Sequence, residues 1–232
     1  GIVGTKCTMS EWHETWRVYM GLVALLDACV GRIIDELKSQ NLYENSLIIF
    51  TTDHGEMLGS HQLFQKMCMY EESVRAPVYI RFPNDEFANT RIVDPVSHID
   101  VFPTICEYLG VELKNRTDGV SLLAEIKNRN VNKRPVYIQY DGNGARGNFQ
   151  RCVIFGQYKL IVDIFKDEIY YELYDIENDV QEKVNLLFAD DPPIELAQSL
   201  VKMLEEHMRH TNDMISLFET DLEKFIGNYK NV

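Results

Sequence analysis

An apolar run leads directly into a polar turn in the stretch Ser46-Leu-Ile-Ile-Phe50-Thr-Thr-Asp53-His54-Gly55-Glu56. The β-branched residues of the run predict a buried strand, and the helical pattern before it favours parallel pairing. Ligands of open α/β sheets bind beyond the carboxyl ends of such strands. The sequence therefore predicts a candidate site at Asp53 and His54.

The side chains of this turn suit a divalent cation. The carboxylate of Asp53 suits Ca²⁺ or Mg²⁺, and the imidazole of His54 extends the choice to Mn²⁺ or Zn²⁺. Lys66 follows 13 residues after Asp53 and could neutralise a sulfuryl or phosphoryl group during its transfer. Each part also has a plain interpretation, as an Asx turn or a surface lysine, and two ligands are too few for calcium. Composition and spacing alone leave both interpretations open.

A long amphipathic helix is expected before the turn. Thr8 and Glu11 have the spacing of a capping box, and apolar residues recur at helical spacing from Trp16 to Leu37. The pattern stops near Gln40, so the helix is expected to end there.

Further elements are expected after the turn. Residues 77–82 and 93–96 are predicted strands, and Asp100 could cap a helix that stops at Gly110. This alternation of helix and strand over residues 10–110 predicts a layered α/β sheet.

The last part of the chain has a different pattern, which predicts an antiparallel sheet followed by helices. The strands are expected at residues 135–140, 151–155, 158–162 and 170–174, and the helices at 192–207 and 211–226. Gly156 suits the turn of a hairpin. The glycine-rich loop 141–147 lacks the G-K-[ST] ending of a phosphate cradle, although Arg146 or Arg151 could reach an anionic substrate. We therefore predict two parts, residues 1–130 and a small α+β subdomain at 131–232.

The composition excludes some classes of function. The chain has 232 residues and a formal net charge of −13, so it would repel a phosphate backbone, and nucleic acid is not an expected partner. It contains no apolar stretch of about 18 residues and opens with no signal peptide, so no membrane span is expected. The five cysteines include no C-x-x-C pair and indicate free thiols, or one bridge with spares. Cys29 and Cys106 are expected in the core.

A longer string adds a resemblance to a known family. The chain reads Phe50-Thr-Thr-Asp-His-Gly-Glu-Met-Leu-Gly-Ser-His-Gln-Leu-Phe-Gln-Lys-Met-Cys-Met-Tyr-Glu-Glu-Ser-Val-Arg-Ala-Pro77. This string closely resembles the sulfatase family of the alkaline phosphatase superfamily, in the branch with the form S-D-H-G-E-M-L-G-D-H-G-L-x-x-K-x-x-x-Y-E-E-S-x-R-V-P. Similar segments elsewhere in the chain extend the resemblance over most of residues 15–205.

The resemblance implies both a fold and a site. The fold would be α/β: part of an alkaline-phosphatase-like layered sheet with flanking helices, followed by a small C-terminal antiparallel sheet with packed helices. Asp53 and His54 would be two ligands of the active-site divalent cation, most often Ca²⁺. Lys66 would contact the sulfate ester and stabilise charge during transfer, and His61 is a further candidate for substrate contact.

Several residues of the string would support this site or change its shape. Tyr70, Glu71 and Arg75 match the family and would hold the loop and the next strand. Ser60 stands where the family usually has Asp, and Gln62 where it usually has Gly. The shape of the loop between the metal ligands and the lysine is therefore expected to differ from the family's usual form.

The resemblance also implies what this chain lacks. Similar sulfatases carry C-x-P-x-R or S-x-P-x-R, whose Cys or Ser becomes the formylglycine nucleophile, and no cysteine here has that context. Two further metal carboxylates would come from an early strand that is also missing. We interpret the chain as a C-terminal portion of a sulfatase, inactive by itself, whose formylglycine lies in the missing N-terminal segment.

The expected partners are a sulfated small molecule or glycan and the missing N-terminal part of the same enzyme. An exposed sheet edge leaves a homo-oligomer open. Family habit favours an exported or lysosomal protein, whereas the unpatterned cysteines favour a reducing interior. Two alternatives stay open: a phosphodiesterase or phosphonate monoester hydrolase of the same superfamily, and a non-catalytic folding or interaction module.

Overall fold

The computed structural model describes residues 2–3, 6–127, 133–142, 148–166, 168–217 and 219–229. The chain divides into two compact units, Gly1–Thr90 and Arg91–Val232. The division of this chain into an α/β part at residues 1–130 and an α+β subdomain at 131–232 stays a prediction.

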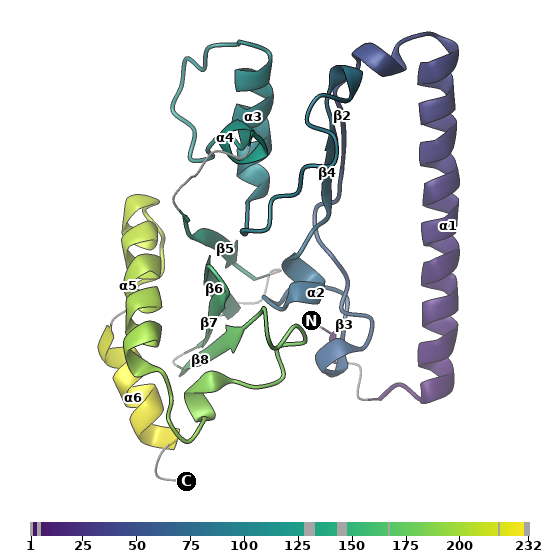
Figure 1. The fold of residues 1–232 in the computed structure, drawn as a ribbon. Helices are drawn as coiled ribbons and strands as arrows, with labels where there is room; N and C mark the ends of the chain where they lie inside the picture. The colour runs from purple at the N-terminus through teal and green to yellow at the C-terminus, as the bar shows by residue number, and fades with distance from the viewer. Residues whose placement is uncertain are drawn as a thin grey trace. The chain divides into compact units, whose positions relative to one another are not determined.

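The first unit opens with the long helix α1, Met9–Ser39 (Figure 1). The capping box is confirmed, since Glu11 N donates to Thr8 Oγ1 at 3.3 Å and Thr8 N donates to Glu11 Oε2 at 2.7 Å. The helix ends at the predicted place, with Gln40 as its C-cap. The start was predictable because capping is a local interaction between residues close in sequence, and the end because the apolar pattern stops there.

The apolar stripe of α1 does not lie in a core. No residue of α1 is buried within the described part of the chain, and Leu26 and Ile33 are 52% and 61% exposed. The expectation that Cys29 lies in the core is wrong, because this thiol is exposed on the same helix. The sequence pattern correctly predicts an amphipathic helix, but it does not say which surface covers the stripe.

Helix α1 contacts the rest of its unit near its two ends. Close to its start, Trp16 Nε1 donates to Leu58 O at 3.0 Å, and the ring of Trp12 meets Phe64 edge-on with centroids 6.0 Å apart. At its end, Lys38 Nζ lies 5.0 Å from the ring centroid of Tyr43. The first of these attachments places α1 against the loop that carries the candidate site.

Two strands flank that loop. Strand β2, Ile48–Thr51, pairs with β4, Val78–Arg81, and the pairing is antiparallel. The prediction of a parallel pairing is therefore wrong for this pair of strands. A parallel pair needs a crossover connection, usually a full helix. The residues between β2 and β4 instead form a long loop that contains a two-residue strand and the one-turn helix α2, Glu71–Val74.

Two further details of this region differ from the sequence prediction. Residues 93–96 form no strand, and Pro95 in this segment cannot donate to a ladder. A short strand pair was not predicted: β1, Ile2–Val3, pairs antiparallel with β3, Leu63–Phe64. Two-residue strands carry too short a pattern to be read from sequence.

In the second unit, helix α3 begins beside a buried carboxylate. Helix α3, Val101–Tyr108, ends before Gly110 at φ 67°, as predicted. Asp100 does not cap it. Its oxygens instead accept from Arg134 Nη1 at 3.1 Å and Nη2 at 2.5 Å, and from Val120 N at 2.9 Å. This pair ties α3 to the segment after the short helix α4, Leu123–Ile126.

The predicted antiparallel sheet is confirmed in this unit. Its order is β5-β6-β7-β8, with bounds Val136–Tyr140, Asn148–Phe155, Tyr158–Phe165 and Glu168–Asp175. Gly156 has φ 60° in the turn between β6 and β7, a conformation that glycine adopts without steric cost. The local turn signal therefore predicted the hairpin correctly.

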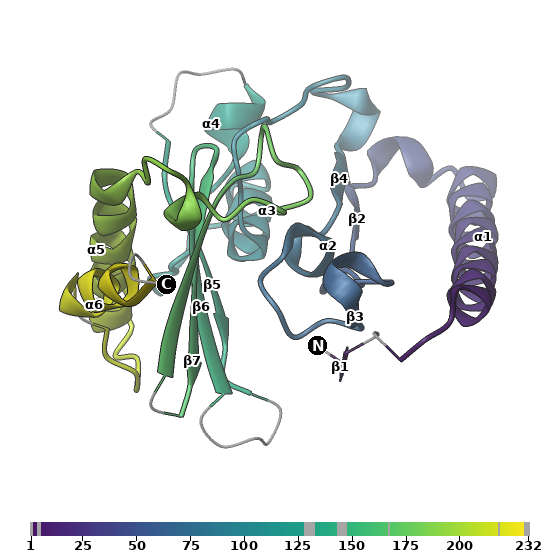
Figure 2. The same ribbon diagram turned by 90° about the horizontal axis from the view of Figure 1, so that it is seen from below.

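Helices α5, Ile194–His210, and α6, Glu219–Tyr229, lie on one face of this sheet (Figure 2). Leu200 and Leu204 of α5 are buried against it, as the helical pattern predicted. Residues 211–217 are not helical, so the second helix starts later than predicted. Asp213 lies in this break, where its Oδ1 accepts from Ile215 N at 3.0 Å and forms an Asx turn that competes with helix.

A histidine near the end of α5 makes the stability of this unit depend on pH. The ring of His207 stacks on Tyr137 with centroids 3.8 Å apart, and Asp118, His210 and Asp213 are the charged neighbours that act on it. Burial lowers the pKa of His207, so its neutral form is favoured in the folded state. Its stabilising effect is complete above the unfolded pKa of about 6.5 and is lost as the pH falls below that value.

We expect His207→Phe, which keeps an aromatic ring and removes the titration, to flatten the dependence of stability on pH between about 7 and 5. Urea unfolding at a series of pH values, followed by circular dichroism, measures this. If the free energy of unfolding changes equally with pH in the variant and the original chain, groups other than His207 cause the pH dependence.

Candidate functional site

The candidate site begins immediately after β2. His54 Nδ1 lies 2.8 Å from Gly55 O. A carbonyl oxygen only accepts, so Nδ1 carries a hydrogen; in the neutral imidazole, Nε2 then has the lone pair that a metal would bind. Nε2 lies 3.3 Å from Asp53 Oδ2. The two groups therefore face one another with the donor atoms that a cation would use.

The carboxylate of this pair is held ionised. Asp53 Oδ1 accepts from His54 N at 2.9 Å and from Thr52 Oγ1 at 3.2 Å. The bond from the His54 amide lowers the pKa of the Asp53 carboxyl group. The negative charge needed for metal binding is thus present at neutral pH.

The turn fits a divalent cation as a partial ligand set. The side chains of Asp53 and His54 are 80% and 38% exposed, so an ion and its other ligands can approach them. No group of three or more His, Cys, Asp or Glu side chains in the described part of the chain could hold a metal. Asp53 and His54 can therefore supply two ligands, and further ligands must be other groups or water.

The turn is packed tightly against the segment that follows the loop. Gly55 N donates to Ser73 O at 2.7 Å. A Cβ atom at residue 55 would lie 2.0 Å from Glu72 O, which no side chain can tolerate. Glycine is therefore required at this position because of close backbone approach.

The loop returns to the turn just before Lys66. Met57 N donates to Gln65 O at 2.8 Å, and Gln65 N donates to Glu56 Oε1 at 2.5 Å. Lys66 is exposed, and no hydrogen bond or ion pair joins its ammonium group to the described residues. The fold thus ties the backbone next to this lysine to residues 56 and 57, directly after the Asp-His turn.

His61 lies at the tip of the same loop. Its ring stacks on Tyr70 with centroids 3.8 Å apart and planes 5° from parallel. His61 and Gln62 have φ 51° and 56°, so the loop is irregular where the chain departs from the family's usual Gly. Contact of His61 with a substrate stays a prediction, and Tyr70 fixes the ring as expected of a supporting residue.

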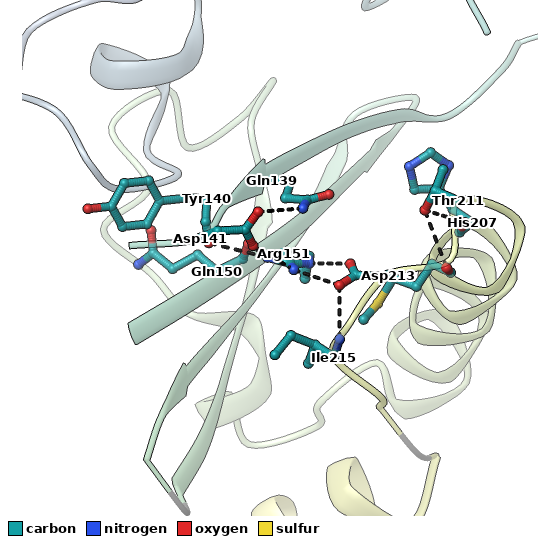
Figure 3. A network of polar contacts seen from close by, with 10 residues as sticks. Gln139, Tyr140, Asp141, Gln150, Arg151, His207, Thr211, Asp213 and Ile215 are labelled. Atoms are coloured by element: carbon teal, nitrogen blue, oxygen red, sulfur yellow. Dashed lines mark hydrogen bonds and ion pairs between the residues drawn. The ribbon is translucent and has the colours of Figure 1, made fainter. Parts of the chain in front are cut away.

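Arg151 is not available to a substrate. Its side chain is 2% exposed and pairs with Asp213 through Nε at 2.6 Å and Nη2 at 2.8 Å (Figure 3). Asp141 Oδ1 lies 2.8 Å from Nη2. The interpretation of Arg151 as a substrate contact is wrong, since the residue links β6 to the end of α5. Arg146, the other candidate, lies outside the described residues.

Comparison with protein-family models identifies the family. Residues 59–212 match the model described as N-sulphoglucosamine sulphohydrolase, C-terminal, and residues 5–111 match the model described as Sulfatase. The fold agrees with this class, and the chain belongs to the sulfatase family, in the alkaline phosphatase-like superfamily.

Particular relatives resemble the chain over most of its length. It is 30% identical to arylsulfatase K of Mus musculus, across 98% of this chain and 43% of that protein. A structure solved in complex with its substrate D-glucosamine-2-N,6-O-disulfate is 27% identical, with a TM-score of 0.73, over 88% of this chain and 42% of that one. The phosphonate monoester hydrolase of Silicibacter pomeroyi is 25% identical, with a TM-score of 0.69, over 90% and 43%.

The chain spans about two fifths of the length of the curated relatives it matches. None of the helices in the described part of the chain has both the length and the apolar composition that crossing a membrane requires.

Proposed function

We propose that this chain is part of a longer sulfatase that hydrolyses a sulfate ester with the help of a divalent cation. The observation that carries the proposal is the Asp53–His54 pair at the end of β2, with Gln65, the residue before Lys66, hydrogen-bonded to Glu56 directly after this pair's turn. Membership of the sulfatase family supports the reaction type. The similar structure with a disulfated glucosamine supports a sulfated sugar or small molecule as substrate.

Each residue has a separate role in this proposal. Asp53 and His54 are two of the metal ligands, and Ca²⁺ suits the carboxylate. When bound, the cation would offset the negative charge of the sulfate oxygens. Lys66 donates to a sulfate oxygen and stabilises the charge that develops during transfer. The nucleophile, a formylglycine, and the remaining ligands belong to a part of the enzyme outside these residues.

A direct assay separates this proposal from its nearest alternative. Similarity to a phosphonate monoester hydrolase favours phosphoester or phosphonate substrates as the second candidate. The full-length protein should be assayed with an aryl sulfate, a sulfated sugar, a phosphodiester and a phosphonate monoester, each with Ca²⁺. Turnover of a sulfate ester supports the proposal, and brisk phosphodiester cleavage without sulfate turnover would replace it with the alternative.

The third candidate is a non-catalytic module. We expect this chain alone to turn over no sulfate ester and to bind Ca²⁺ only weakly, because two protein ligands are too few. Calorimetry with Ca²⁺ tests this. A dissociation constant tighter than about 1 μM, or about 8 kcal/mol, would mean that the chain holds a complete site by itself.

The exposed stripe of α1 gives a prediction about assembly. Since Val23 and Leu26 are 45% and 52% exposed, we propose that the stripe packs against the rest of the longer enzyme. The chain alone is then expected to self-associate, because exposed apolar side chains along one face of a helix favour association. Light scattering should show that Val23→Glu with Leu26→Glu reduces the association.

A matched control adds a negative charge elsewhere on α1. Arg32 lies on the same exposed helix, and its substitution by glutamate removes no apolar side chain. We expect it to change association less than the double substitution. A monodisperse monomer of the unchanged chain would contradict the prediction.

A further inference from the structure

The loop between the Asp-His turn and Lys66 has a strained backbone. Left-handed φ values occur at four of its residues other than glycine and at the residue after the lysine: Leu58 at 44°, His61 at 51°, Gln62 at 56°, Gln65 at 68° and Met67 at 77°. Side chains with a Cβ rarely adopt this conformation, and it persists only where the surrounding structure enforces it. Gln65 and Met67 lie on either side of Lys66, so the backbone that carries the lysine needs specific support.

Glu56 supplies that support. Its Oε1 accepts from Gln65 N at 2.5 Å and from Leu58 N at 3.5 Å. The backbone of its neighbour adds a third link, since Met57 N donates to Gln65 O at 2.8 Å. Hydrogen bonds from backbone amides to a carboxylate are stronger than those to a neutral acceptor. The two sides of the loop are therefore joined at Gln65, one residue before Lys66.

The hydrogen bonds of Glu56 relate the position of Lys66 to that of the metal ligands. Glu56 follows His54 by two residues, and Gly55 between them is fixed by its bond to Ser73 O at 2.7 Å. The turn thus provides a rigid base, and the Glu56 carboxylate sets where the chain lies when it reaches Lys66. Without this carboxylate, the amide of Gln65 loses its partner, and the bond from Met57 N to Gln65 O is left to hold the strained segment.

We propose that Glu56 is a positioning residue that holds Lys66 at a fixed place relative to Asp53 and His54. This inference rests on the proposed function, because it assigns Glu56 a role only through the lysine that contacts the sulfate. The hydrogen bonds of Glu56 favour this positioning role. Its hydrogen-bond partners among the described residues are backbone N–H groups of its own loop.

A double-mutant cycle in the full-length protein tests the proposal. We expect Glu56→Ala to lower kcat for a sulfate ester about 10- to 100-fold, since a displacement of about 1 Å from productive geometry has effects of this size. We expect Glu56→Gln to keep most of the activity, because its amide oxygen can still accept from Gln65 N. In a Lys66→Ala background, Glu56→Ala should cause little further loss.

A second measurement does not depend on activity. Amide hydrogen exchange should become faster at Gln65 and Met57 in Glu56→Ala and stay slow in Glu56→Gln, while exchange in strands β6 and β7 stays unchanged. If Glu56→Ala yields no folded protein, Glu56→Asp, which shortens the side chain by one methylene, takes its place in both experiments.

The outcomes separate this inference from the proposed function. If Lys66→Ala leaves sulfate hydrolysis intact, the role of Lys66 in the proposed function is wrong. If Lys66→Ala impairs hydrolysis but Glu56→Ala is harmless, or is equally damaging with and without Lys66, the positioning role of Glu56 is overturned. Equal damage by Glu56→Gln and Glu56→Ala would also overturn it, since the acceptor oxygen would then not be what matters.

Discussion

Asp53→Asn is expected to lower kcat/KM of the full-length protein for a sulfate ester by about 10³-fold or more. The substitution keeps the shape of the side chain and removes the charge that lies 3.3 Å from His54 Nε2. A metal ion contributes several kcal/mol of charge stabilisation to such a reaction, and about 4 kcal/mol corresponds to a factor of 10³. Loss of a charged ligand weakens both the binding of the ion and its placement.

The measurement needs a metal titration as well as a rate. Steady-state assays over a range of Ca²⁺ concentrations should show that Asp53→Asn needs more Ca²⁺ for half-maximal activity. Asp190→Asn removes the same charge from an exposed residue outside the site and should change the rate less than about threefold. Rates for Asp53→Asn within a few-fold of the unchanged enzyme would show that Asp53 does not bind the catalytic ion.

Local signals predicted several elements of the fold correctly. The Thr8–Glu11 capping box defines the start of α1, and Gly156 defines the β6–β7 hairpin. Both are interactions between residues a few positions apart, so a single sequence contains them in full. The buried face of α5 was predictable for the same reason, since helical spacing alone defines which side chains share a face.

Properties that depend on distant partners could not be predicted in this way. The pairing direction of β2 and the exposure of the α1 stripe, including Cys29, depend on what lies beside them. Apolar spacing indicates that a face is covered by something, but it does not identify the covering surface. The errors in the sequence prediction are concentrated there.

The candidate site shows the same contrast between what a local pattern predicts and what depends on contacts. Asp53, His54 and Lys66 carry side-chain chemistry that a motif reveals, and the fold ties the lysine's segment to the turn. Glu56 belongs to the same motif, yet its role was not predictable, because its partners are backbone amides two and nine residues away. The sequence alone does not show that an acidic residue of a motif accepts hydrogen bonds from backbone amides.

A buried ion pair in the second unit gives the largest expected effect on stability. Lys159 Nζ of β7 lies 2.8 Å from Glu182 Oε1, and both side chains are 0% exposed. Lys159→Met alone leaves the carboxylate of Glu182 buried without its cation. Breaking such a pair typically costs about 3–5 kcal/mol, because the remaining charge stays desolvated after its partner is removed. We therefore expect Lys159→Met to destabilise this unit by that amount.

The stability of the double variant Lys159→Met with Glu182→Met should be compared with that of the single variant. Replacing both members of a buried pair with apolar residues of similar volume is often neutral or stabilising, so we expect it to recover most of the loss. Lys166→Met, at the exposed lysine directly after β7, is the control and should change stability by less than about 0.5 kcal/mol.

The choice of probe follows from the two compact units. Both tryptophans, Trp12 and Trp16, lie in α1, so their fluorescence reports on the first unit. Urea unfolding of the second unit should be followed by circular dichroism and by amide exchange in β7, with tryptophan fluorescence as an internal control. If the single variant unfolds at the original urea concentration, the pair contributes no net stability. If the double variant is as unstable as the single one, lost packing rather than an unpaired charge explains the effect.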